Sequence, residues 1–112
     1  MSDDERRRAK RYTLWVPIQM EQGPDVQVLA VSRNISGTGV LVIAGAKLEV
    51  GAKLSLTLSV PSEDDRALTG TIVRVEPNEE DPEGLWRHRL AIQFDTPVPE
   101  LEAAFERLEK RE

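Results

Sequence analysis

Five cationic residues stand together near the start of the chain, and such a cluster can bind an anion. Residues 6–11 carry a charge of +5 and the rest of the chain carries −10, which gives the net charge of −5. Proteins that bind nucleic acids usually spread lysine and arginine over a whole face, so the acidic body disfavours DNA or RNA as a partner. A small anion fits better, although a solvated tail that binds nothing has the same composition. The cluster consists of Arg6, Arg7, Arg8, Lys10 and Arg11.

A second candidate is the stretch NISGTG at residues 34–39, which interrupts apolar, strand-like sequence. Asn and Ser side chains bond to their own nearby backbone and glycine accepts a positive φ, so the stretch is typical of a turn between two strands. The same residues could also hold a ligand. Asn34 offers an amide donor and a carbonyl acceptor, Ser36 offers a hydroxyl, and Gly39 would let a ligand approach the backbone without a Cβ in the way.

The two stretches together resemble a known family. Arg7 and Arg11 form an R-x-x-x-R pair, and Asn34 to Gly39 follow as [D/N]-x-S-x-x-G. This combination is similar to the signature of PilZ domains, bacterial receptors for the second messenger cyclic di-GMP. The resemblance covers nearly the whole chain, because PilZ domains have similar size, place the arginines just before a six-stranded barrel and often end in a helix.

The resemblance implies a site and a mechanism. Arg7 and Arg11 would contact the phosphates and guanines of cyclic di-GMP, and the barrel side of the site would be lined by Asn34, Ser36 and Gly39. A guanidinium can fork to phosphate oxygens or to guanine O6 and N7, and can stack on a base. Because the arginines precede the barrel, we expect ligand binding to order a mobile arm, and a separate, unidentified protein to detect that change.

The remaining cations of the cluster have different expected roles. Arg6 precedes the first matched arginine, an arrangement that resembles family members with two stacked ligand molecules per chain. Arg8 and Lys10 lie between the matched positions and are expected to supply solvated charge.

Catalytic and metal chemistry finds little support in the residue types. His88 is the single histidine, and the chain has no cysteine to complete a metal site with it. Neither a nucleophile-elbow pattern nor a phosphate-binding loop pattern is present, so we predict no enzyme activity, no catalytic residue, no bound metal and no cofactor. The lack of cysteine suits a reducing cytoplasm, and no apolar run reaches the roughly 20 residues that span a bilayer, so we expect no membrane insertion.

Two alternatives to a cyclic di-GMP receptor stay open. One is an adaptor of the same fold that binds a protein without any nucleotide. The other is a small-barrel nucleic-acid binder, which the acidic body and the low aromatic content of 4% disfavour.

The elements that must position these residues are mostly strands. Apolar and polar residues alternate over 13–20, 53–60 and 86–94, and apolar runs flank NISGTG on both sides. Another run, LTGTIVRV, follows the polar break at 61–66, which makes six strands. Pro17 suggests that the first strand is an edge strand or contains a bulge. Short connections favour an antiparallel meander that curls into a barrel.

A helix is predicted at the end of the chain. Pro99 opens a pattern with one apolar stripe, and Glu106 stands four residues before Lys110. The predicted fold is therefore all-β with a terminal helix, a six-stranded antiparallel, PilZ-like split barrel capped by that helix. We divide the chain into a flexible basic arm at 1–11 and a barrel with its helix at 12–112. The stripe consists of Leu101, Ala104, Phe105 and Leu108.

Overall fold

The computed structural model describes residues 10–111. Arg6, Arg7 and Arg8 lie outside the described residues, whereas Lys10 and Arg11 lie inside them.

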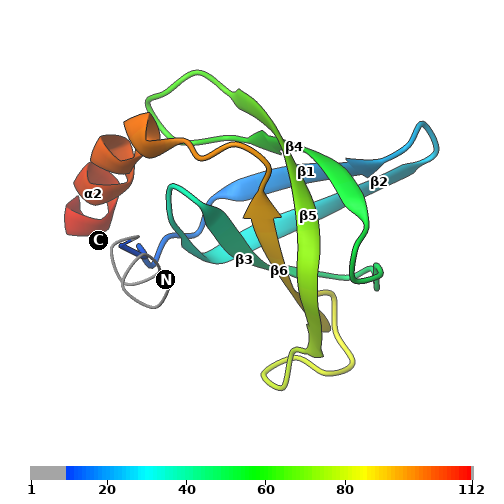
Figure 1. The fold of residues 1–112 in the computed structure, drawn as a ribbon. Coiled ribbons are helices and arrows are strands. Elements are labelled where there is room, and N and C mark those ends of the chain that lie inside the picture. Colours follow the sequence, from blue (N-terminus) through cyan, green and yellow to red (C-terminus); the bar gives the residue numbers. More distant parts are fainter. Residues whose placement is uncertain (1–9, 112) are drawn as a thin grey trace, which may run out of the picture.

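Six antiparallel strands close into a barrel, and one helix follows them at the C-terminal end (Figure 1). The predicted fold class is thus confirmed. After β6, a short connecting segment leads into a 3-10 helix, and the C-terminal α-helix follows it directly. The strands are β1 (Pro17–Gln22), β2 (Val26–Ile35), β3 (Gly39–Ala44), β4 (Lys53–Leu58), β5 (Arg66–Pro77) and β6 (His88–Phe94), followed by η1 (Pro99–Leu101) and α2 (Glu102–Arg111).

The order of strands around the barrel is β1-β2-β3-β6-β5-β4, so the prediction of a simple meander was wrong. Two three-stranded meanders are joined by the pairing of β3 with β6 and of β1 with β4. The consecutive strands β3 and β4 are not neighbours. Alternation along a strand determines which of its side chains face the core, but it does not determine which other strand pairs with it.

The core is built from residues of all six strands, and most of the alternating apolar positions predicted over 13–20, 53–60 and 86–94 are buried in it, whereas β3 is buried along its whole length. The first apolar series runs through Tyr12, Leu14 and Val16 before β1 begins at Pro17. Pro17 is neither an edge residue nor a bulge, because the barrel is closed and β1 pairs in unbroken register with β2. It is instead the first residue of its strand, a place where proline is tolerated.

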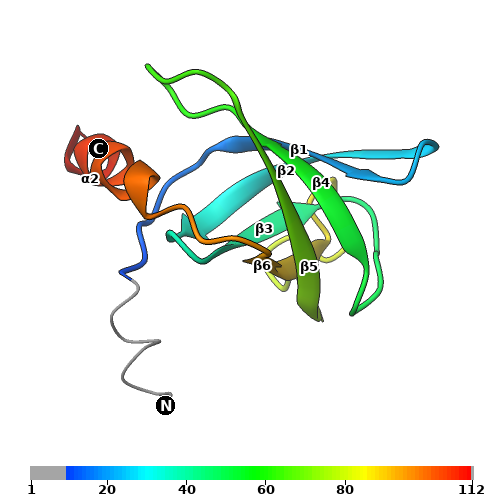
Figure 2. The ribbon, with the colours of Figure 1, turned by 45° about the horizontal axis from the view of Figure 1, so that its top comes forward.

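Helix α2 covers the end of the barrel near the β2–β3 turn and the start of the described chain (Figure 1). Figure 2 shows the same arrangement from a second direction. Phe105 is fully buried and its ring centroid lies 5.8 Å from that of Tyr12. Leu101 and Ala104 are buried with it, and Leu108 packs against this core, so the predicted apolar stripe is confirmed. Within the described residues, no helix is long and apolar enough to cross a membrane.

Candidate functional site

The structure brings the basic segment and the NISGTG stretch into direct contact. Arg11 Nη1 donates a hydrogen bond of 2.6 Å to the side-chain oxygen of Asn34. Two backbone hydrogen bonds fix this arrangement: Tyr12 N–H donates to Ile35 O at 2.8 Å, and Ile35 N–H donates to Tyr12 O at 2.9 Å. Because neighbouring residues of a strand point to opposite faces, burying Tyr12 and Ile35 turns Arg11 and Asn34 onto the same outer face, where they lie diagonally across the bridge.

A β-bulge in β2 shapes the outer face of the site. Ser32 pairs with Val42 and Asn34 pairs with Leu41, so Arg33 is the extra residue. As a result, the consecutive residues Arg33 and Asn34 are both half-exposed, while Ser32 is buried. Bulges of this kind often redirect side chains next to functional sites. The bulge therefore lets two consecutive polar residues of β2, Arg33 and Asn34, face outward.

Ser36 is fully buried and closes the β2–β3 turn. Its Oγ accepts hydrogen bonds from the N–H groups of Thr38 and Gly39 at 3.1 and 3.2 Å, and its own N–H donates to Gly39 O at 2.9 Å. These contacts are those of a serine turn. A contact between Ser36 and a ligand stays a prediction, and the serine already has a structural role without one.

The two glycines of the turn are required for space and not for a positive φ, which corrects our reading of the stretch. Neither Gly37 nor Gly39 has a φ in the left-handed region. A Cβ on Gly39 would lie 2.6 Å from the carbonyl oxygen of Ile92 on β6, and one on Gly37 would collide with the carboxylate of Glu102. Close packing of β3 on β6, and of the turn on α2, explains both residues. The proposed approach of a ligand to Gly39 remains a prediction.

Three glutamates of α2 lie near the start of the described chain, and nothing in the sequence pattern indicated this. A carboxylate oxygen of Glu109 accepts a hydrogen bond of 2.8 Å from the backbone N–H of Thr13. Burial raises the pKa of the Tyr12 phenol, and the negative charges of Glu102, Glu106 and Glu109 raise it further. The helix therefore places negative charge close to Tyr12 and Thr13, the two residues that follow Arg11.

His88 occupies the first position of β6, opposite Ala44 of β3 and Pro77 of β5. It is half-buried on the strand, which agrees with its prediction as a strand residue.

A family model described as the PilZ domain matches residues 5–110. The chain belongs to the PilZ family. PilZ domains are non-catalytic receptors for cyclic di-GMP. The match includes Arg6, Arg7 and Arg11 as well as the whole NISGTG stretch.

Solved structures show the same fold at low sequence identity. The PilZ domain of YcgR from Escherichia coli, solved with c-di-GMP, has a TM-score of 0.69 at 14% identity, with 95% of this chain and 90% of that chain covered. The inhibitor of motility MotI/DgrA of Bacillus subtilis has a TM-score of 0.69 at 17% identity, with 92% of this chain covered. The MrkH–c-di-GMP complex of K. pneumonia has a TM-score of 0.68 at 15% identity, with 90% of this chain covered.

This PilZ chain spans 49% of the MotI/DgrA chain and 49% of the MrkH chain. No curated protein sequence is similar enough to count as a relative.

Proposed function

We propose that this PilZ domain binds cyclic di-GMP at the junction of the arginine segment and the β2–β3 turn. The observation that carries the proposal is the 2.6 Å contact between Arg11 and Asn34, one residue from each half of the family signature. Their proximity means that a ligand can touch both halves at once. The structures of YcgR and MrkH with c-di-GMP add support through their shared fold.

The chemistry of the two side chains suits a dianionic purine ligand. A guanidinium has five N–H donors, and Arg11 directs one of its terminal nitrogens to Asn34. The other donors are available for phosphate oxygens or for O6 and N7 of guanine. Asn34 retains its amide N–H groups, which can donate to the same ligand. Among residues 10–111, no ion pair involves Arg11, so its charge is not neutralised by a carboxylate of that part.

Arg6 and Arg7 complete the proposed site. Arg7 would add a second guanidinium to the phosphates, and Arg6 would permit a second, stacked ligand molecule. Charge-assisted hydrogen bonds contribute roughly 1.5–3 kcal/mol each, so two arginines and Asn34 could give micromolar affinity after the cost of ordering the chain. Ser36 and Gly39 would line the ligand from the barrel side.

Ligand binding would be signalled by a change in the surface that the protein presents to a partner. Ligand binding would order the basic arm against the rigid barrel, and a separate partner protein in the cytoplasm would recognise the ordered form. The division into an arm at 1–11 and a barrel at 12–112 belongs to this proposal.

Isothermal titration of the full chain with cyclic di-GMP at ~150 mM salt tests the proposal, because this ionic strength screens non-specific attraction. We expect saturable binding that Arg11→Ala and Asn34→Ala each weaken strongly. Arg74→Ala is the matched control, since Arg74 is exposed on β5, which does not pair with β2. GTP should not compete.

The stoichiometry of the titration shows whether one or two molecules of cyclic di-GMP bind per chain. A ratio of two per chain that falls to one in Arg6→Ala supports the stacked arrangement, and a ratio of one in the wild type excludes it. No binding by the wild-type chain would exclude the receptor function and favour the adaptor that acts without nucleotide.

A further inference from the structure

We propose that Trp15 and Arg33 form a second base-binding surface, which holds one purine of the ligand beside the site of Arg11 and Asn34. This inference rests on the proposed function and extends it to residues outside the family signature. It identifies the chemical feature recognised, a purine ring with acceptors on its edge, and the residues that recognise it.

Backbone contacts place Trp15 next to Arg33. The N–H of Val16 donates to Ser32 Oγ at 2.8 Å, and the N–H of Ser32 donates to Val16 O at 3.0 Å. These bonds hold the segment before β1 alongside β2. Trp15 and Arg33, each one residue away, therefore lie together on the outer face, and the guanidinium carbon of Arg33 lies 5.3 Å from the centroid of the Trp15 ring.

Trp15 is 56% exposed, although the chain has only two tryptophans and few other aromatic residues. A single exposed apolar side chain needs no special explanation by itself. What distinguishes Trp15 is that its indole is paired with a cation and adjoins the proposed site. The β2 bulge makes this surface continuous, because Arg33 and its neighbour Asn34 both face outward.

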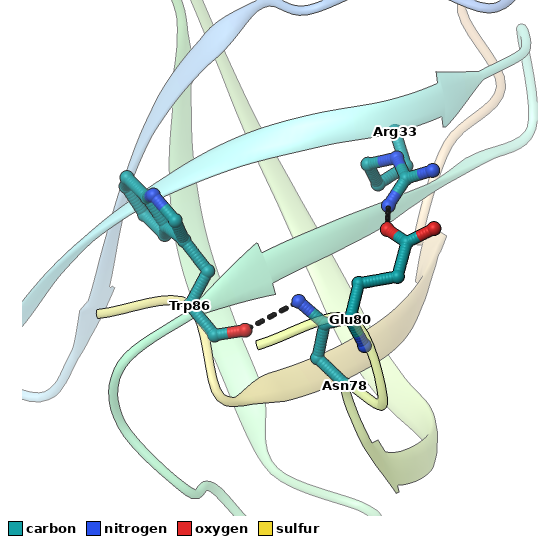
Figure 3. Close-up of polar contacts among 4 residues, drawn as sticks. All are labelled: Arg33, Asn78, Glu80 and Trp86. Carbon is teal, nitrogen blue, oxygen red and sulfur yellow. Dashed lines mark hydrogen bonds and ion pairs between the residues drawn. The ribbon is translucent and has the colours of Figure 1, made fainter. Parts of the chain in front are cut away.

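The β5–β6 loop holds Arg33 in position before any ligand arrives (Figure 3). Arg33 Nη1 lies 2.7 Å from a carboxylate oxygen of Glu80, and the Arg33 side chain is only 32% exposed. Asn78, which is buried, fixes the loop: its amide donates to Trp86 O at 2.5 Å, and its side-chain oxygen accepts from the N–H of Glu80 at 3.3 Å. Fixing the arginine in advance lowers the entropy lost on binding.

The pair matches the chemistry of a purine. Every nucleobase has a π face that stacks on an indole or on a guanidinium. The N–H fork of Arg33 can also donate to O6 and N7 of guanine, whereas adenine has an amino donor in place of O6. The ion pair with Glu80 engages only Nη1 of Arg33, so the other N–H groups of the guanidinium can donate to the ligand while the pair persists. The surface therefore favours a guanine over an adenine.

Tryptophan fluorescence gives a direct test. In a Trp86→Phe background, Trp15 is the only tryptophan, so its emission reports contact with the ligand. We expect cyclic di-GMP to quench it saturably, with the same dissociation constant that calorimetry gives. Trp15→Leu and Arg33→Ala should each weaken binding by about tenfold, as expected for loss of one stacked base. Arg33→Ala should also reduce the preference for cyclic di-GMP over cyclic di-AMP.

The controls separate this proposal from the function on which it rests. Leu29→Ala removes a different large, exposed apolar side chain, which lies on β2, and this variant should keep the wild-type affinity for cyclic di-GMP. Normal cyclic di-GMP affinity in both Trp15→Leu and Arg33→Ala, with unchanged Trp15 emission, would overturn the second surface and leave the receptor function intact. Failure of the wild-type chain to bind cyclic di-GMP would overturn both.

Discussion

The carboxylate of Glu109 accepts a hydrogen bond of 2.8 Å from the backbone N–H of Thr13, 96 positions earlier in the chain. This bond ties helix α2 to the segment that carries Arg11. Tyr12, between Arg11 and Thr13, packs its ring against Phe105 of the same helix. The position of Arg11 thus depends on the helix as well as on β2.

Replacing Glu109 by Ala should lower the free energy of unfolding by about 1 kcal/mol, the usual net contribution of one hydrogen bond. Urea denaturation measures this change. Glu106→Ala is a matched control, because Glu106 forms an exposed i,i+4 pair with Lys110 at 3.4 Å, which contributes only about 0.2–0.5 kcal/mol. Equal losses in the two variants would contradict a specific role for the Glu109–Thr13 bond.

Gly39→Ala should destabilise the barrel by about 2–3 kcal/mol, because the added Cβ would meet the Ile92 carbonyl oxygen at 2.6 Å and neither backbone can move freely. Gly37→Ala should cost less, since its added methyl meets only the side chain of Glu102, which can rotate away. Thermal or urea denaturation compares the two variants. If Gly37→Ala were the more damaging, the packing explanation for these glycines would be wrong.

Ser36→Ala should lower stability by about 1–2 kcal/mol, because the buried Oγ accepts from the N–H groups of both Thr38 and Gly39. Ser55→Ala, at an exposed position of β4, should have little effect on urea denaturation. A Ser36→Ala variant with wild-type stability but weakened cyclic di-GMP binding would mean that the hydroxyl serves the ligand and not the turn.

Tyr12 should titrate above its ordinary pKa near 10, since burial disfavours the phenolate and the carboxylates of Glu102, Glu106 and Glu109 repel it. Above pH 10 the unfolded chain then binds fewer protons than the folded chain, so stability falls as pH rises. Tyr12 is the only tyrosine, and the absorbance of its phenolate gives the pKa directly.

The effect of Tyr12 on stability at high pH can be tested by removing its hydroxyl group. Tyr12→Phe should remove this contribution to the loss of stability above pH 10. A phenolate midpoint at the ordinary value in the folded protein would contradict the predicted environment of Tyr12.

The sequence by itself determined the features that depend on local chemistry. Alternation predicted three of the strands and their buried faces, because the side chains of a strand point to opposite sides whatever its neighbour is. The other three strands were predicted from short apolar runs bounded by turn residues. The stripe of α2 followed from helical spacing in the same way. The two halves of the family signature were readable because residue type and spacing carry them.

Only the tertiary structure decided how these parts meet. The pairing of β3 with β6, the contact of Arg11 with Asn34, the bond from Thr13 to Glu109 and the placement of Trp15 against Arg33 all join residues distant in sequence. Gly39 shows the difference: the sequence indicated backbone freedom, but the reason is the close approach of β6. Such contacts depend on how the barrel closes, and no local pattern encodes that choice.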